Sequence, residues 1–158
     1  MNWQQVCETA ELQNLPFKFE LNERGQIIMS PVKVNHSLFQ GEIEYWLRKS
    51  LKKGKTFPEC AIKTRKGTKV ADVVWASPER VEQIKHQAEC LIAPEICIEV
   101  LSESNSDEEM REKQALYFEQ AAQEVWICNE DGVISFYTPN GQVAHSALAP
   151  QFPQIVKI

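Results

Sequence analysis

The chain has 158 residues, of which 43% are hydrophobic and 25% are charged, and its formal net charge is −5. These values are typical of a globular domain and exclude a wholly disordered chain, collagen and a coiled coil. No apolar run is long enough to span a membrane, so we expect one domain over residues 1–158 with no membrane contact.

The first half of the chain mixes helical and strand patterns. Apolar residues recur at helical spacing in two segments, and alternating segments on either side of Asn22–Gly25 are typical of a hairpin. The predicted elements, in order, are a helix, two hairpin strands, a long helix and two strands: 2–13, 17–21, 26–30, 35–52, 58–64 and 70–76.

The second half predicts a short helix, a central strand, a helix and three short strands: 77–87, 96–101, 106–121, 124–128, 133–137 and 142–146. The run Ile96–Leu101 is apolar apart from Glu99, which is typical of a strand covered on both faces. Ser106 and Glu109 have the spacing of a capping box at the start of a helix. This order predicts an α/β (α+β) fold with a mixed β-sheet flanked by helices, to which the last strands add.

Cysteine usage and the first residues bear on location. The five cysteines are scattered and include no CxxC pair, which disfavours a disulfide framework or a structural zinc site. Residues 1–5 lack the basic and apolar segments of a signal peptide. We therefore expect a cytoplasmic protein.

Charge is unevenly distributed along the chain. The stretch Arg48–Lys69 holds nine basic residues and one acid, Glu59, whereas Glu95–Glu112 holds seven acids and one base. Such a pair of stretches is either a phosphate-binding rim beside a cation site or two solvated faces.

Two carboxylates interrupt apolar strand patterns. Asp72 lies in the strand Val70–Trp75, and Glu99 lies in Ile96–Leu101. Each would be at a strand end in water, or would be paired inside the fold, because an ionised carboxylate rarely enters a buried strand alone. Two such carboxylates on neighbouring strands favour a site for Mg²⁺ or Mn²⁺.

Two basic side chains lie on helix faces that point inward. Lys113 shares a predicted face with Tyr117, and either extends to solvent along a buried stem or reaches toward Glu99. In the second case it could polarise a phosphate or orient an attacking water. His36 shares a face with Phe39, which is more typical of a core or capping histidine than of a ligand.

In this order, these features resemble the PD-(D/E)xK nuclease superfamily, and more closely the Uma-type family of small bacterial restriction endonuclease-like proteins. The likeness runs from Phe19 to Ile127. Its parts are the opening hairpin, the histidine of the long helix, the two carboxylate strands and a K…Y…VW segment: Phe19–Ile27, Asn35–His36, Val70–Val73, Ala93–Ser102, Lys113, Tyr117 and Val125–Ile127.

The resemblance implies a restriction endonuclease-like fold and metal-dependent hydrolysis of phosphodiester bonds in DNA. It assigns Asp72 and Glu99, with the backbone carbonyl of Val100, to one or two Mg²⁺ or Mn²⁺ ions. The metal would activate a water and stabilise charge on the phosphate. The basic stretch would bind the nucleic-acid backbone without reading sequence.

The remaining site residues also come from the resemblance. Lys113 would orient the water or the phosphate, and His36 or Glu20 would add an outer contact. Leu101 stands where the superfamily pattern E-x-K has its lysine, so Lys113 on the helix would replace it. Ala71 stands where the family has a proline without chemical function.

Two other functions stay open. The chain could be a catalytically inactive nuclease fold that binds nucleic acid or another partner, which the net charge and the missing E-x-K lysine favour. It could also be a structural protein in which Asp72, Glu99 and Lys113 form a buried charge cluster. A nuclease that cuts both strands needs two active sites, so a homodimer is expected in the first case.

Overall fold

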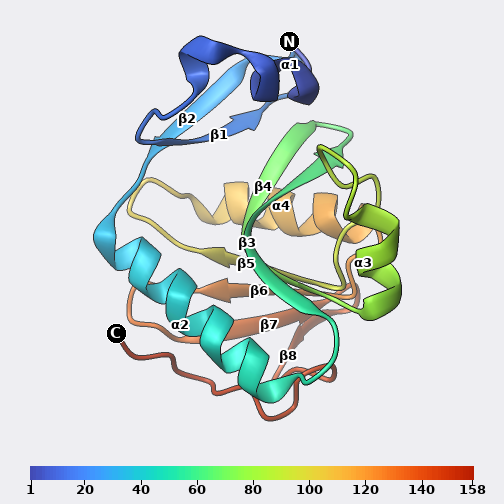
Figure 1. Cartoon of the computed structure of the whole chain (residues 1–158). Helices are drawn as coiled ribbons and strands as arrows, with labels where there is room; N and C mark the ends of the chain where they lie inside the picture. The colour runs from blue at the N-terminus through green and yellow to red at the C-terminus, as the bar shows by residue number, and fades with distance from the viewer.

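The computed structural model describes all of residues 1–158 (Figure 1). Its helices are α1 (Trp3–Glu8), α2 (Val34–Ser50), α3 (Pro78–Ile84) and α4 (Asp107–Glu119), with a 3₁₀ turn at Ala10–Leu12. Its strands are β1 (Phe17–Leu21), β2 (Ile27–Pro31), β3 (Lys55–Thr64), β4 (Gly67–Ala76), β5 (Ile96–Val100), β6 (Glu124–Cys128), β7 (Ile134–Thr138) and β8 (Gly141–Val143).

The main sheet has six strands in the order β3-β4-β5-β6-β7-β8. All neighbours are antiparallel except β5 and β6, which run parallel and are connected by α4. The prediction of a mixed sheet flanked by helices, extended by the last strands, is therefore confirmed. Strands β1 and β2 form a separate two-stranded sheet.

Two apolar clusters cover the two faces of the main sheet. Phe39, Ile43 and Leu47 of α2 pack on one face, together with the C-terminal segment 149–156. Helices α3 and α4 cover the other face, where Tyr117 is among the buried side chains. Alternate residues of β5 enter the two clusters, so Cys97 and Glu99 face α4 while Ile98 faces α2. The central strand is covered on both faces, as its apolar run predicts.

The β1–β2 hairpin lies at one end of the molecule, over the turn that joins β3 to β4 (Figure 1). This turn depends on Gly67, whose φ is +90°, a conformation that side chains disfavour. A Cβ at this position would also collide with the backbone oxygens of Leu21 and Asn22 at the end of β1. The hairpin therefore packs directly against a position that has no side chain.

Some boundaries differ from the sequence predictions. The helix expected at 2–13 is broken, because Thr9 has extended backbone angles between α1 and the 3₁₀ turn. Strands β3 and β4 are longer than expected because they pair along a tight hairpin at Thr64–Gly67. Ser106 does cap α4, but the Glu109 carboxylate accepts from Asn105 Nδ2, so only half of the predicted capping box forms.

All five cysteines are free thiols, and only Cys7 is exposed. None of the helices combines the length and the apolar character that crossing a bilayer requires.

Candidate active site

The two strand carboxylates lie side by side on β4 and β5, at the point where the pairing of these two strands ends. Asp72 and Glu99 are almost fully buried, with 1% and 2% of their surfaces exposed. Strand β4 pairs with β5 from Trp75–Ile96 to Val73–Ile98, and Asp72 and Glu99 are the next residues beyond that ladder. The backbone N–H of Val100 then donates to Asp72 Oδ2 over 2.7 Å, so a side chain replaces the next ladder acceptor. Val100 thus adjoins the site through its N–H.

A lysine from the small sheet lies between these carboxylates. Lys18 Nζ is 2.8 Å from Asp72 Oδ1 and 3.9 Å from Glu99 Oε2. Burial disfavours its charged form, but Glu99, Asp72 and Glu20 outweigh this and raise the pKa of Lys18. One ammonium group therefore bridges both strand carboxylates.

A second lysine approaches from α4. Lys113 is 8% exposed at its side chain, and its Nζ lies 2.9 Å from Glu20 Oε2 and 3.6 Å from Glu99 Oε1. The structure thus places Lys113 inside the fold rather than extended to solvent. The hydroxyl of Tyr117, one turn further along the helix, donates to Glu99 Oε1 over 2.6 Å. Helix α4 therefore holds Glu99 through two residues on one face.

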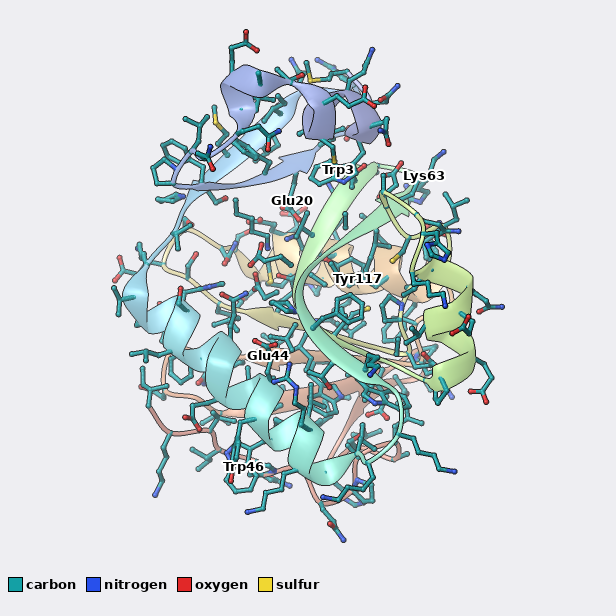
Figure 2. All side chains as sticks on the ribbon, viewed as in Figure 1. Trp3, Glu20, Glu44, Trp46, Lys63 and Tyr117 are labelled. Atoms are coloured by element: carbon teal, nitrogen blue, oxygen red, sulfur yellow. The ribbon has the colours of Figure 1, made fainter.

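Glu20 connects the hairpin to the main sheet. Its Oε2 accepts from the backbone N–H of Val70 over 2.6 Å and from Lys113. In Figure 2 it lies between the β1–β2 hairpin and the six-stranded sheet, and Tyr117 lies deeper in the molecule. Burial opposes ionisation of Glu20, but Lys113 and Lys18 lower its pKa below the usual value. Glu20 is therefore part of the same charge cluster.

His36, in the first turn of α2, contacts the Asp72 carboxylate oxygen that does not face Lys18. Its Nε2 lies 3.3 Å from Asp72 Oδ2, and its Nδ1 lies 3.2 Å from Gln40 Oε1. The Gln40 amide nitrogen donates to Glu59 Oε1 and to the Asp72 backbone carbonyl, so its oxygen must face the histidine. Both ring nitrogens therefore face acceptors, as in an imidazolium. The hydrogen bond to Asp72 accordingly raises the pKa of His36.

Glu59 lies directly across the β3–β4 ladder from Asp72. The pairs on either side are Pro58–Val73 and Cys60–Ala71, whereas Glu59 itself has a φ of +53°. This left-handed conformation is unusual for a residue other than glycine and is typical of functional sites. The Asp72 backbone carbonyl, opposite Glu59, accepts a hydrogen bond from the Gln40 side chain.

A cavity of about 250 Å³, most of whose lining residues are polar or charged, opens over the cluster. It is bounded by β1, the start of α2, the middle of β4, the end of β5, the loop 102–105 and α4. Its charged lining includes Lys18, Glu20, His36, Asp72, Glu99 and Lys113. The predicted site residues therefore line one cavity, and Asp72 and Glu99 lie at its buried base.

The two strand carboxylates titrate in opposite directions. Burial raises the pKa of Glu99 to about 7, against the opposing effect of Lys113 and Lys18. Burial acts on Asp72 too, but Lys18 and His36 hold its pKa well below the usual range. Asp72 is thus ionised over the whole physiological range, whereas Glu99 changes its charge near neutrality.

The donor set fits a hard divalent cation. Asp72 and Glu99 offer carboxylate oxygens, and both already face one cationic group, the ammonium of Lys18. No group of three acidic, histidine or cysteine side chains forms a protein-only ligand set. A cation held here would keep several water ligands, as Mg²⁺ usually does.

The basic stretch is divided between two regions. At the β3–β4 turn, Lys66 pairs with Glu112, so the predicted basic and acidic stretches meet there, and Arg65 pairs with Glu119 beyond the acidic stretch. The residues from Arg48 to Lys55 lie at the other end of α2 from His36, about 20 Å away at 1.5 Å per residue. Figure 1 shows this end of α2 far from the hairpin. These lysines could contact only a long substrate that also fills the cavity.

Sequence reasoning missed four residues of this site. Lys18 alternates with Glu20 on β1, so the two share a strand face, and Gln40 follows His36 by one helical turn. Helical spacing places Tyr117 on the correct face of α4 but does not indicate its hydrogen bond to Glu99. Glu59 stood out only as an acid among basic residues.

The family described as "Putative restriction endonuclease", Uma2, matches residues 3–156. The chain belongs to this family. Its structure is also similar to a crystal structure described as "a putative nuclease belonging to DUF820 from Anabaena variabilis". The TM-score is 0.69 and the identity 20%, over 88% of this chain and 80% of that one. At this identity the similarity shows the nuclease-like fold, and the family match links that fold to nucleic acid. Curated proteins give no match.

Proposed function

We propose that the protein is a metal-dependent endonuclease that hydrolyses phosphodiester bonds in DNA. The observation that carries the proposal is the convergence of two buried carboxylates, Asp72 and Glu99, on one cationic group beneath an open polar cavity. Family membership supports a nucleic-acid substrate. A buried charge cluster that served stability alone would not need a cavity above it.

Asp72 and Glu99 would hold Mg²⁺ or Mn²⁺, with the Val100 carbonyl as the third protein ligand. When bound, the metal would supply an activated water and neutralise charge on the phosphate. Lys113 is fixed between Glu20 and Glu99, with its ammonium at the cavity wall. It can therefore donate to a phosphate oxygen or to a water.

His36 and Glu20 would act from the edge of the site. His36 holds Asp72 in place and lines the cavity, where its protonated form would attract an anionic substrate. Glu20 positions Lys113 through their 2.9 Å ion pair. The exposed lysines beyond the end of α2 would bind the DNA backbone outside the cleaved bond, so affinity should fall steeply with salt.

A second function has one observation in its favour. Lys18 already satisfies both strand carboxylates, so the charge cluster is complete without a metal. An inactive nuclease fold that binds nucleic acid would have this property. It would bind DNA in a salt-sensitive manner without metal-dependent cleavage.

The deciding experiment is calorimetric titration of Mn²⁺ into wild type, Asp72→Ala and Glu99→Ala, with cleavage of supercoiled plasmid measured in parallel. Glu124→Gln is the matched control, because Glu124 is another buried strand carboxylate that lies outside the cavity. We expect wild type and the control to bind Mn²⁺ and cleave DNA, and both site variants to do neither. Cleavage by a folded Glu99→Ala variant would overturn the proposal.

Two further properties belong to the same proposal. Cleavage of both strands would need a homodimer, and β8 at the edge of the main sheet is exposed along its length. Sedimentation at several concentrations would measure this. The free cysteines support a reducing, cytoplasmic setting.

A further inference from the structure

Lys18 differs from every other cation of the site in its position. Its ammonium contacts Asp72 Oδ1 at 2.8 Å and Glu99 Oε2 at 3.9 Å, so it lies between the carboxylates that β4 and β5 carry. Lys113 contacts the other oxygen of Glu99 and has no contact with Asp72. Only Lys18 therefore stands where a divalent cation shared by the two carboxylates would have to be.

Because Lys18 contacts Asp72, its ammonium group and a divalent cation cannot occupy the site at the same time. Asp72 Oδ2 is already engaged by the Val100 N–H and by His36, which leaves Oδ1 as the oxygen that faces Lys18. Mg²⁺ would bind a carboxylate oxygen at about 2.0–2.1 Å. An ammonium group at hydrogen-bonding distance from the same oxygen and a metal cannot share that position, both for steric reasons and because like charges repel.

The cavity leaves room for the Lys18 side chain to move away from Asp72 and Glu99. This side chain is 16% exposed, whereas those of Asp72 and Glu99 are 2–3% exposed, and it forms part of the cavity wall. It comes from β1, which belongs to the small sheet rather than to the main one. The lysine stem can therefore turn into the cavity while Asp72 and Glu99 stay in their strands.

We propose that Lys18 is an internal substitute for the divalent cation: it occupies the position between Asp72 and Glu99 in the metal-free protein and leaves it when the metal binds. This inference rests on the proposed function, since it assumes the same metal position. It explains how two buried carboxylates are kept together without metal. Lys18 thereby sets the metal affinity of the site, because every binding event must displace it.

The test is calorimetric titration of Mn²⁺ into wild type, Lys18→Met, Lys113→Met and Lys33→Met. Methionine keeps the apolar stem and removes the charge. Lys33 is the matched control, since it lines the same cavity and forms no ion pair. We expect Lys18→Met to bind Mn²⁺ on the order of tenfold more tightly than wild type or more, Lys113→Met to gain less, and Lys33→Met to stay near wild type.

A second measurement uses the unaltered protein, so that it does not depend on the folding of a variant. Saturating Mn²⁺ should speed hydrogen exchange in β1 and β2, because the hairpin loses its contact with Asp72. Ordinary ligand binding would slow exchange there or leave it unchanged, and either result would count against displacement.

The outcomes separate the inference from the proposed function. If wild type binds Mn²⁺ and Lys18→Met binds it no more tightly, or if Lys113→Met gains as much, Lys18 is not the occupant although the metal site stands. If Lys18→Met binds Mn²⁺ and wild type does not, displacement is supported in its strongest form. If neither binds, the metal site and the inference fail together.

Discussion

The backbone N–H of Val100 and the side chain of Asp72 form a 2.7 Å hydrogen bond across the gap where β4 and β5 stop pairing. This bond fixes one carboxylate oxygen and directs the other toward Lys18 and the cavity. The carboxylate cluster thus forms where the β4–β5 ladder ends before β4 does.

Replacing Asp72 with Asn should abolish activity while the fold survives. The amide has nearly the same shape, but it carries no charge for a metal, and its NH₂ group would face a donor, either Lys18 or the Val100 N–H. We expect Mg²⁺-dependent cleavage of plasmid DNA to fall by roughly a hundredfold or more. Near-normal cleavage by a variant with a native circular dichroism spectrum would contradict this.

Glu99 should make the metal-free protein less stable as pH rises. Its pKa is about 7 in the folded protein and 4.5 as the ordinary value, so between these pH values the folded state binds more protons than the unfolded state. The free energy of unfolding should then fall by roughly 3 kcal/mol from pH 4.5 to 7. His36, whose pKa is also raised, acts in the same direction.

The measurement is urea unfolding of wild type and Glu99→Gln from pH 5 to pH 8 in the presence of a chelator. The variant cannot titrate at this position, so its stability should depend less on pH. Asp72 and Glu20 have lowered pKa values and contribute only below the ordinary range of carboxylates. Equal slopes for the two proteins would show that Glu99 ionises normally.

Tyr117→Phe should destabilise the protein through Glu99. The lost hydroxyl donates a 2.6 Å bond to a buried carboxylate, and bonds to charged groups are worth about 1.5–3 kcal/mol. Tyr137→Phe is the control, because Tyr137 lies in β7 and its hydroxyl bonds to no protein atom. Urea unfolding at pH 8, where Glu99 is charged, should show a clear loss for the first variant only.

Lys113 and Glu20 should be energetically coupled. Their ion pair is mostly buried, and removing one partner leaves a charge without compensation, which costs about 3–5 kcal/mol. In a double-mutant cycle of Lys113→Met and Glu20→Gln, the double variant should be more stable than the sum of the single losses predicts. Simple additivity would mean that the pair does not hold the hairpin to α4.

The sequence predicted best those features that depend on the residue pattern within a single strand or helix. The apolar run of β5 predicted a central strand, with its single acid either paired inside the fold or at a strand end, and helical spacing put Lys113 and Tyr117 on one face of α4. These inferences need only local periodicity. Asp72 could be singled out in the same way, as a charge inside an apolar strand.

The contacts of Lys18 could not be predicted, because they depend on where the small sheet docks. Lys18 and Asp72 are far apart in the chain, and nothing in the alternation of β1 indicates which of its faces meets the main sheet. The left-handed backbone of Glu59 is equally hidden, since it arises from the pairing of β3 with β4. Such relationships become visible only when the strands are placed in space.

Gly67 lies outside the candidate site but fixes the position of the strand that enters it. The end of β1 rests on its bare Cα, and the same strand carries Lys18 and Glu20 into the charge cluster. Even a methyl group there would lift the strand and draw both side chains outward together. The spacing between this turn and β1 therefore sets how far Lys18 and Glu20 reach into the charge cluster, although Gly67 itself does not line the cavity.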